Sequence, residues 1–129
     1  MMAMNKSKML RQSIEAALHN AADIAYCYRY ALPTVKPPFC VYSFNLLQTI
    51  GCVEQYDLML DLSGVGLTGA DVDEISDRIA AYMDYLIFAD STQSWACYLS
   101  SRQAIDDKDV SIQRRRLNFE LRYVSRMED

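Results

Sequence analysis

The stretch YDLMLDLSG, from Tyr56 to Gly64, alternates strictly between apolar and polar side chains. Successive side chains of a β-strand point to opposite faces of a sheet. One face of this stretch would therefore be apolar, carrying Tyr56, Leu58, Leu60 and Leu62. Such alternation is typical of a strand with one buried and one exposed face. It predicts a mainly antiparallel sheet, since parallel sheets are covered on both faces.

A second long stretch, SIQRRRLNFELRYVSR from Ser111 to Arg126, allows two interpretations. Its arginines and aromatic residues could bind nucleic acid, or they could belong to a strand. Four large apolar residues share one face, namely Leu117, Phe119, Leu121 and Tyr123, and the other carries Arg114, Arg116, Asn118, Glu120, Arg122 and Arg126. A nucleic-acid-binding arm has no need of such an apolar face. The net charge of −4 also opposes phosphate binding. We therefore expect a core strand with a solvated arginine face, and no sequence-specific nucleic-acid partner.

The rest of the chain supplies two amphipathic helices and further strands. Helical spacing of apolar residues predicts helices over residues 7–20 and 71–86. Thr68 or Asp71 could cap the second helix. Extended patterns predict strands over residues 39–44 and 95–101, a turn over 45–49 and a charged loop over 102–109. Residues 24–30 alternate as a short strand would, and a helical continuation there stays open. The expected core is Leu10, Ile14, Leu18, Val41, Leu58, Leu60, Ile75, Ile79, Leu86, Leu117, Phe119 and Leu121.

Together these elements predict an α+β fold. We expect a twisted, mainly antiparallel sheet of about four to five strands with two helices packed on it. A length of 129 residues fits a single domain over residues 1–129. Hydrophobic residues make up 51% and charged residues 23% of the chain, which excludes a disordered protein.

Catalytic and cofactor motifs are not evident. The four cysteines form no C-x-x-C pair, and the single histidine, His19, has no ligand partners at metal-binding spacing. The N-terminal segment lacks the apolar run of a signal peptide, and no stretch is long enough to span a membrane. We therefore expect a soluble, intracellular protein that is not an enzyme, with no metal, no cofactor and no membrane partner.

The glycines Gly64, Gly66 and Gly69 match the bare G-x-G-x-x-G spacing of dinucleotide-binding loops. However, Asp71, Asp73 and Glu74 follow directly. Their carboxylates would lie where a pyrophosphate binds, at the N-terminus of the helix. The chain is also too short for the usual wound sheet. We therefore interpret the stretch as a loop that precedes a capped helix.

The order of these pieces resembles a phage protein family. The segments are LRQSIEAAL, PPFCVYSF, YDLMLDLSG, ADVDEISDRIAAYMDYL and RRRLNFELRY, which together cover nearly the whole chain. They resemble the tail completion, or tail terminator, proteins of long-tailed bacteriophages, which are also called minor tail or head–tail joining proteins. The tyrosine-rich segment 24–30 and the double proline depart from that pattern.

The resemblance implies a non-enzymatic assembly protein of a phage or prophage tail. Such a protein forms a hexameric ring that caps the tail tube and joins tail to head. Its partners would be copies of itself, the major tail tube protein and the head connector protein. Its location would be the cytoplasm of the bacterial host during assembly and then the tail of the virion. An alternative is a small ligand-binding or regulatory module that dimerises through its sheet.

The candidate interface residues come from the polar faces of the two long strands. They are Arg114, Arg116, Arg122 and Arg126, with Asp57 and Asp61 as candidates for the opposite charge. These charges could meet across subunits, or they could pair within one subunit, because neighbouring strands bring such side chains to about 5 Å. Both possibilities remain open from the sequence.

Overall fold

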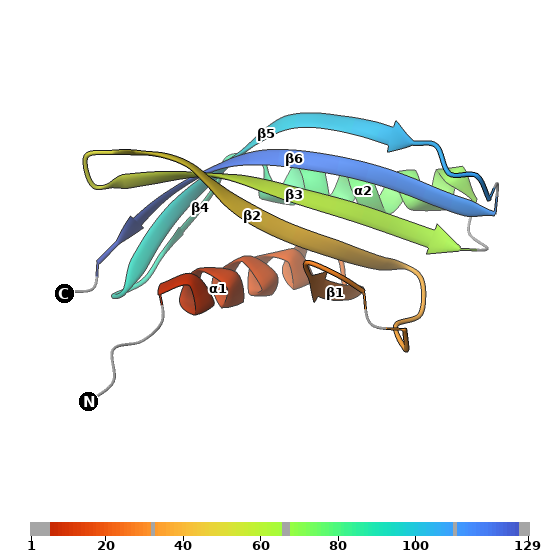
Figure 1. Ribbon diagram of the computed structural model, residues 1–129, viewed down its shortest axis with the longest axis horizontal. Helices are drawn as coiled ribbons and strands as arrows, with labels where there is room; N and C mark the ends of the chain where they lie inside the picture. Colours follow the sequence, from red (N-terminus) through yellow and green to blue (C-terminus); the bar gives the residue numbers. More distant parts are fainter. Residues whose placement is uncertain (1–5, 32, 66–67, 110, 127–129) are drawn as a thin grey trace.

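The computed structural model describes residues 6–31, 33–65, 68–109 and 111–126, with the side chain of residue 65 left out. Two helices, each followed by three strands, make up this part of the chain (Figure 1). In chain order they are α1 (Lys6–Ala21), β1 (Ala25–Tyr28), β2 (Phe39–Ile50), β3 (Val53–Val65), α2 (Gly69–Met83), β4 (Leu86–Ala89), β5 (Gln93–Ile105) and β6 (Ile112–Ser125).

The strands form one curled sheet in the order β1-β2-β3-β6-β5-β4. Every neighbouring pair is antiparallel except β1 and β2, which are parallel. The predicted α+β class, with two helices packed on a mainly antiparallel sheet, is thus confirmed. The sheet has six strands where four to five were expected. The additional strand is β4, whose apolar residues had been assigned partly to the end of the second helix.

The core lies between the sheet and the two helices. Leu58 and Leu60 of β3 and Leu117, Phe119 and Leu121 of β6 have no exposed surface, as the alternation predicted. From α1, the predicted residues Leu10, Ile14 and Leu18 are buried as well, and Ile79 of α2 joins them. Ile75 and Leu86 are only partly buried and pack against the core.

Val41 was wrongly placed in the core. Along β2 the buried side chains are those of Cys40, Tyr42 and Phe44, so Val41 points to the other face and is only partly buried. In the run FCVYSF both alternating sets are largely apolar. Residue type alone therefore could not show which set faces the helices.

Buried polar contacts attach α1 to the sheet. The indole Nε1 of Trp95 donates a 2.9 Å hydrogen bond to Oγ of Ser13, whose hydroxyl donates to the backbone carbonyl of Leu10. The hydroxyl of Tyr26 donates to the carbonyls of Leu18 and Ala22, at the end of the helix. Burial raises the pKa of Tyr26 above its ordinary value, so this hydroxyl remains a donor at physiological pH.

The start of α2 is capped as the sequence indicated. Thr68 is the N-cap, and its Oγ1 accepts from the backbone N–H of Asp71, whose carboxylate accepts from the backbone N–H of Thr68. This reciprocal arrangement is a capping box. A side-chain carboxylate therefore already occupies the end of the helix where an anion would bind. Of the three glycines considered, Gly66 lies outside the described residues.

Three predicted boundaries were wrong. The turn expected over residues 45–49 is strand, because β2 continues to Ile50 and the chain reverses at Gly51, whose φ is 61°. The loop expected over residues 102–109 begins later, since β5 continues to Ile105. The helix expected to reach residue 86 ends at Met83, and Tyr85 follows with a φ of 63°. The segment 24–30, left open, contains the short edge strand β1.

Candidate functional site

The face of the sheet that points away from both helices is the candidate site, and we call it the open face. β3 and β6 form its centre and pair in antiparallel register. Their outward side chains are partly buried or exposed rather than fully buried. The open face includes Asp57, Met59 and Asp61 of β3 and Arg114, Arg116, Asn118, Glu120 and Arg122 of β6.

Arg116 and Asp61 are brought together within one chain. They are direct partners in the β3–β6 register, and Nε of Arg116 donates to Oδ1 of Asp61 at 2.9 Å. The two side chains are 32% and 23% exposed. Arg114 has a different partner, because its guanidinium lies 3.8 Å from the carboxylate of Asp107 in the β5–β6 loop. The pairing within one subunit that the sequence left open is thus present for Arg116.

Asp57 is not paired with an arginine. Its direct partner across the register is Glu120, a like charge, and its Oδ1 accepts a 3.4 Å hydrogen bond from Asn118. Arg122 donates instead to Glu120, its neighbour two residues along β6, at 2.8 Å. The predicted aspartates therefore have different surroundings, and only Asp61 has the arginine partner that we considered.

A chain of polar contacts crosses the open face at the level of Arg122. The amide of Gln48 donates to that of Gln55 at 2.7 Å, and Gln55 donates to Glu120 at 2.6 Å. The guanidinium carbon of Arg122 also lies 5.3 Å from the ring centroid of Tyr98. These contacts link β2, β3, β6 and β5, and they hold the Arg122 side chain, which is 58% exposed, in a defined place.

Arg126 lies just after the end of β6. Its backbone N–H donates to the carbonyl of Thr92 at 2.7 Å, and its side chain is exposed. The nearby Asp90 has a pKa below its ordinary value because Thr92 and Gln93 donate hydrogen bonds to its carboxylate, with a smaller effect of the Arg126 charge. Arg126 thus follows the strand that carries Arg114, Arg116 and Arg122 and lies beyond its C-terminal end.

Two arginines that the sequence analysis did not single out face the helices instead. Arg115 donates to Asp73 of α2 at 2.6 Å, and Arg102 donates to Asp77 and Ser76 of the same helix. The bond from Arg115 is the main reason why the pKa of Asp73 lies below its ordinary value. The sequence could have indicated this for Arg115. It lies two residues before Leu117 in the strand, so its side chain points to the same, helix-covered face of the sheet.

The β2–β3 hairpin extends beyond the helices (Figure 1). All residues from Asn45 to Cys52 are exposed, among them the apolar side chains of Leu46, Leu47 and Ile50. A shallow hollow of ≈ 350 Å³ lies beside the turn end of the hairpin, lined by Ile50, Val53, Gln55 and Arg122. An uncovered hairpin with apolar side chains is typical of a segment that contacts another protein.

The open face has a composition that is common at protein interfaces. It combines paired charges, amides and aromatic rings, and arginine and tyrosine are enriched at protein interfaces. Among the residues that the structure describes, no group of three or more His, Cys, Asp or Glu side chains could hold a metal ion. Within the same residues, no helix is both long and apolar enough to cross a membrane.

Comparison with solved structures identifies a similar fold. No family model matches the chain, and no curated protein matches it. The fold is similar to that of a chain in the solved structure entitled "Virion of native gene transfer agent (GTA) particle", with a TM-score of 0.67. The match covers 90% of this chain and 91% of that chain at 13% sequence identity. Over nearly its full length, the protein therefore shares the fold of a chain from that virion.

Proposed function

We propose that the protein is a non-enzymatic structural component of a phage-like particle, and that it acts as a tail terminator. In this role a ring of copies, which we expect to be a hexamer, caps the tail tube and joins the tail to the head. The observation that carries the proposal is the fold similarity to a virion chain, which extends over 90% of this protein. The resemblance of its sequence segments to tail completion proteins supports the more specific role.

The open face supports a role in protein contacts. It is the side of the six-stranded sheet that neither α1 nor α2 covers. Its arginine and tyrosine side chains are held in place by contacts with neighbouring strands. We assign the contact with a neighbouring subunit or with the tube protein to this face, through Arg114, Arg116, Arg122 and Arg126 together with Asp57 and Asp61. Head connector and major tail tube proteins are the further partners in the proposal.

The test of function is deletion of the gene in a strain that produces the particles. Electron microscopy should then show tails of abnormal length and few heads joined to tails, and the wild-type gene should restore normal particles. Normal particles in normal number from the deletion strain would contradict the proposal. A discrete dimer that dissociates on addition of a small ligand would favour the alternative of a regulatory module.

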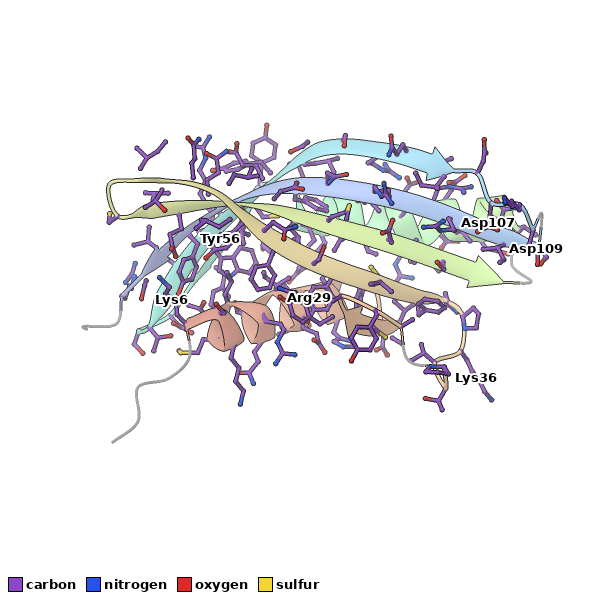
Figure 2. All side chains as sticks on the ribbon, in the orientation of Figure 1. Lys6, Arg29, Lys36, Tyr56, Asp107 and Asp109 are labelled. Atoms are coloured by element: carbon purple, nitrogen blue, oxygen red, sulfur yellow. The ribbon has the colours of Figure 1, made fainter. Side chains whose placement is uncertain are left out.

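The open face is tested by the double variant Arg116→Glu, Arg122→Glu. The variant should remain folded, because partly exposed ion pairs contribute only about 0–1 kcal/mol to stability. It should fail to restore particles in the deletion strain, since like charges across an interface cost several kcal/mol. Lys36→Glu is the control, because this exposed residue lies in the loop before β2, away from the open face (Figure 2). A folded double variant that restores normal particles would exclude these arginines from the contact.

A further inference from the structure

Two arginines lie beside an aromatic ring rather than beside a carboxylate. The guanidinium carbons of Arg11 in α1 and Arg29 after β1 lie 5.4 and 5.2 Å from the ring centroid of Tyr28. Within the described part of the chain neither has an acidic partner at ion-pair distance, whereas the five arginines of β5 and β6 each have one, namely Arg102, Arg114, Arg115, Arg116 and Arg122. Part of the positive charge that has no ion-pair partner therefore lies around Tyr28, and we call Arg11, Tyr28 and Arg29 the arginine–tyrosine cluster.

The core holds this cluster in a fixed position. The ring of Tyr28 packs on Tyr42 and Phe44, with centroid distances of 5.4 and 5.5 Å. Arg29 has a φ of 71°, a left-handed conformation that is uncommon for a residue other than glycine. Its backbone N–H donates to the carbonyl of Tyr42 at 2.8 Å, which keeps the residue against β2. Both guanidinium groups are thus presented at the surface on a rigid support.

A hollow adjoins the cluster on the outside of the molecule. It has a volume of ≈ 470 Å³ and is lined by Ser7, Lys8, Arg11 and Tyr28. The nearest acidic residue on the same helix face, Glu15, already accepts a hydrogen bond from Tyr42. A guanidinium group presents planar donors that match a carboxylate in a bidentate manner. The hollow is therefore suited to acidic side chains from another molecule.

The opposite charge is found at another place on the same chain. The β5–β6 loop and the first turns of α2 meet at one end of the sheet, since β3 ends beside the start of β6. This acidic end carries Asp71, Asp73, Glu74, Asp106, Asp107 and Asp109, and its cationic neighbours include Arg102, Lys108, Arg114 and Arg115. Among the described residues, Glu74 and Asp106 have no cationic partner at ion-pair distance. Figure 2 places Asp107 and Asp109 at this end, well away from Arg29.

We propose that the arginine–tyrosine cluster of one copy binds the acidic end of a second copy. Two different surfaces of each copy then meet head to tail, and such a contact generates a closed ring when the rotation between copies closes. The occupant is a second copy rather than nucleic acid, because the chain supplies the complementary charge itself and its net charge is −4. The inference rests on the proposed ring and names the surfaces that would build it.

Sedimentation of the purified full-length protein at several concentrations and salt levels tests the proposal, because it needs no particle. Wild type should associate at low salt and dissociate as the salt concentration rises. Arg11→Glu and Asp106→Arg should each weaken association by roughly 10- to 100-fold, since each places like charges opposite one another. An equimolar mixture of the two variants should associate like wild type, because the altered surfaces then complement each other in an alternating ring.

Arg11→Lys keeps the charge but loses the bidentate geometry, so it should weaken association less than Arg11→Glu does. Lys36→Glu, which changes the charge elsewhere, is the control and should associate nearly as wild type. Circular dichroism should show that every variant is folded. If Asp106→Arg does not fold, Asp106→Asn takes its place. A wild type that stays monomeric at low salt, or two weakened variants that do not recover on mixing, would overturn the proposal. Retention of duplex DNA that is lost in Arg11→Glu, without self-association, would also overturn it. Failure of the gene deletion to alter particles would contradict the proposed function alone.

Discussion

The two faces of the sheet are built from the same strands but differ in burial and polarity. On the helix-covered face, Leu60 and Phe119 have no exposed surface. One residue further along β3, Asp61 forms an ion pair with Arg116, and both side chains remain partly exposed. Apolar burial dominates folding free energy, whereas such ion pairs contribute little. The comparison indicates that one face determines stability and that the other is free to determine contacts.

The largest effect is expected on the covered face. Leu60→Ala and Phe119→Ala should each lower the free energy of unfolding by about 2–5 kcal/mol, because each leaves a cavity in a fully buried site. Urea denaturation followed by circular dichroism measures the change. Met59→Ala, on the open face of β3, is the matched control and should cost less than about 1 kcal/mol. Equal losses of unfolding free energy from substitutions on the two faces would contradict the inference that the covered face determines stability.

A smaller effect is expected where a polar group is buried under α1. Ser13→Ala removes the acceptor of the Trp95 indole N–H, which has no other hydrogen-bond acceptor among the residues that the structure describes. A buried donor without an acceptor costs about 1–3 kcal/mol. Thermal unfolding should show the loss. Trp95→Phe in the Ser13→Ala background separates the cost of the unpaired indole N–H from the other effects of the serine substitution, because the phenylalanine has no N–H. A Ser13→Ala protein as stable as wild type would show that this bond does not hold the helix.

The contact of Arg115 with Asp73 should have a measurable pH dependence. Arg115→Met should lower stability near neutral pH by roughly 0.5–1 kcal/mol, since Asp73 is largely exposed. Arg115 lowers the pKa of Asp73 below its ordinary value of 3.8. The ionised carboxylate therefore stabilises the fold above that value, and the contribution fades as the pH falls through the lowered pKa. The difference between variant and wild type should shrink toward pH 3, and a constant difference would exclude this pair as its source.

The smallest effect is expected for the open face itself. A double-mutant cycle on Arg116→Ala and Asp61→Ala should give a coupling energy of about 0.2–1 kcal/mol. Chemical denaturation of the four proteins provides this value. A coupling well above this range would mean that the open face also holds the fold together, and the contrast between the two faces would then be weaker than we infer.

The fold was largely predictable because β3 and β6 alternate so strictly. Each of their predicted core residues is buried, and Thr68 caps α2 as its sequence context indicated. Prediction was wrong where both alternating sets were apolar, as around Val41, and where a short strand followed a helix directly, as at β4. The loop predicted to begin at Arg102 was also wrong, because residues 102–105 pair with β6 and extend β5, although their polar side chains gave no strand pattern.

The candidate site was predictable only in part. The alternation placed Arg114, Arg116 and Arg122 on the polar face, and pairing of Arg116 with Asp61 was one of the two possibilities considered. The arrangement of Arg11 and Arg29 around Tyr28 could not be predicted, because it depends on how α1 lies against β1 and on the left-handed backbone of Arg29. These are tertiary features without a local sequence signal.

The turn of the β2–β3 hairpin has a practical consequence for chemical labelling. Cys52 is exposed there, whereas Cys40 and Cys97 are buried and Cys27 is partly buried. Burial raises the pKa of Cys97 to about 12 and that of Cys40 still further. Since only a thiolate reacts rapidly with maleimides, a fluorophore should attach to Cys52 of the native protein first. The natural sequence thus already offers a reporter at the tip of the hairpin, where a neighbouring molecule would alter its emission.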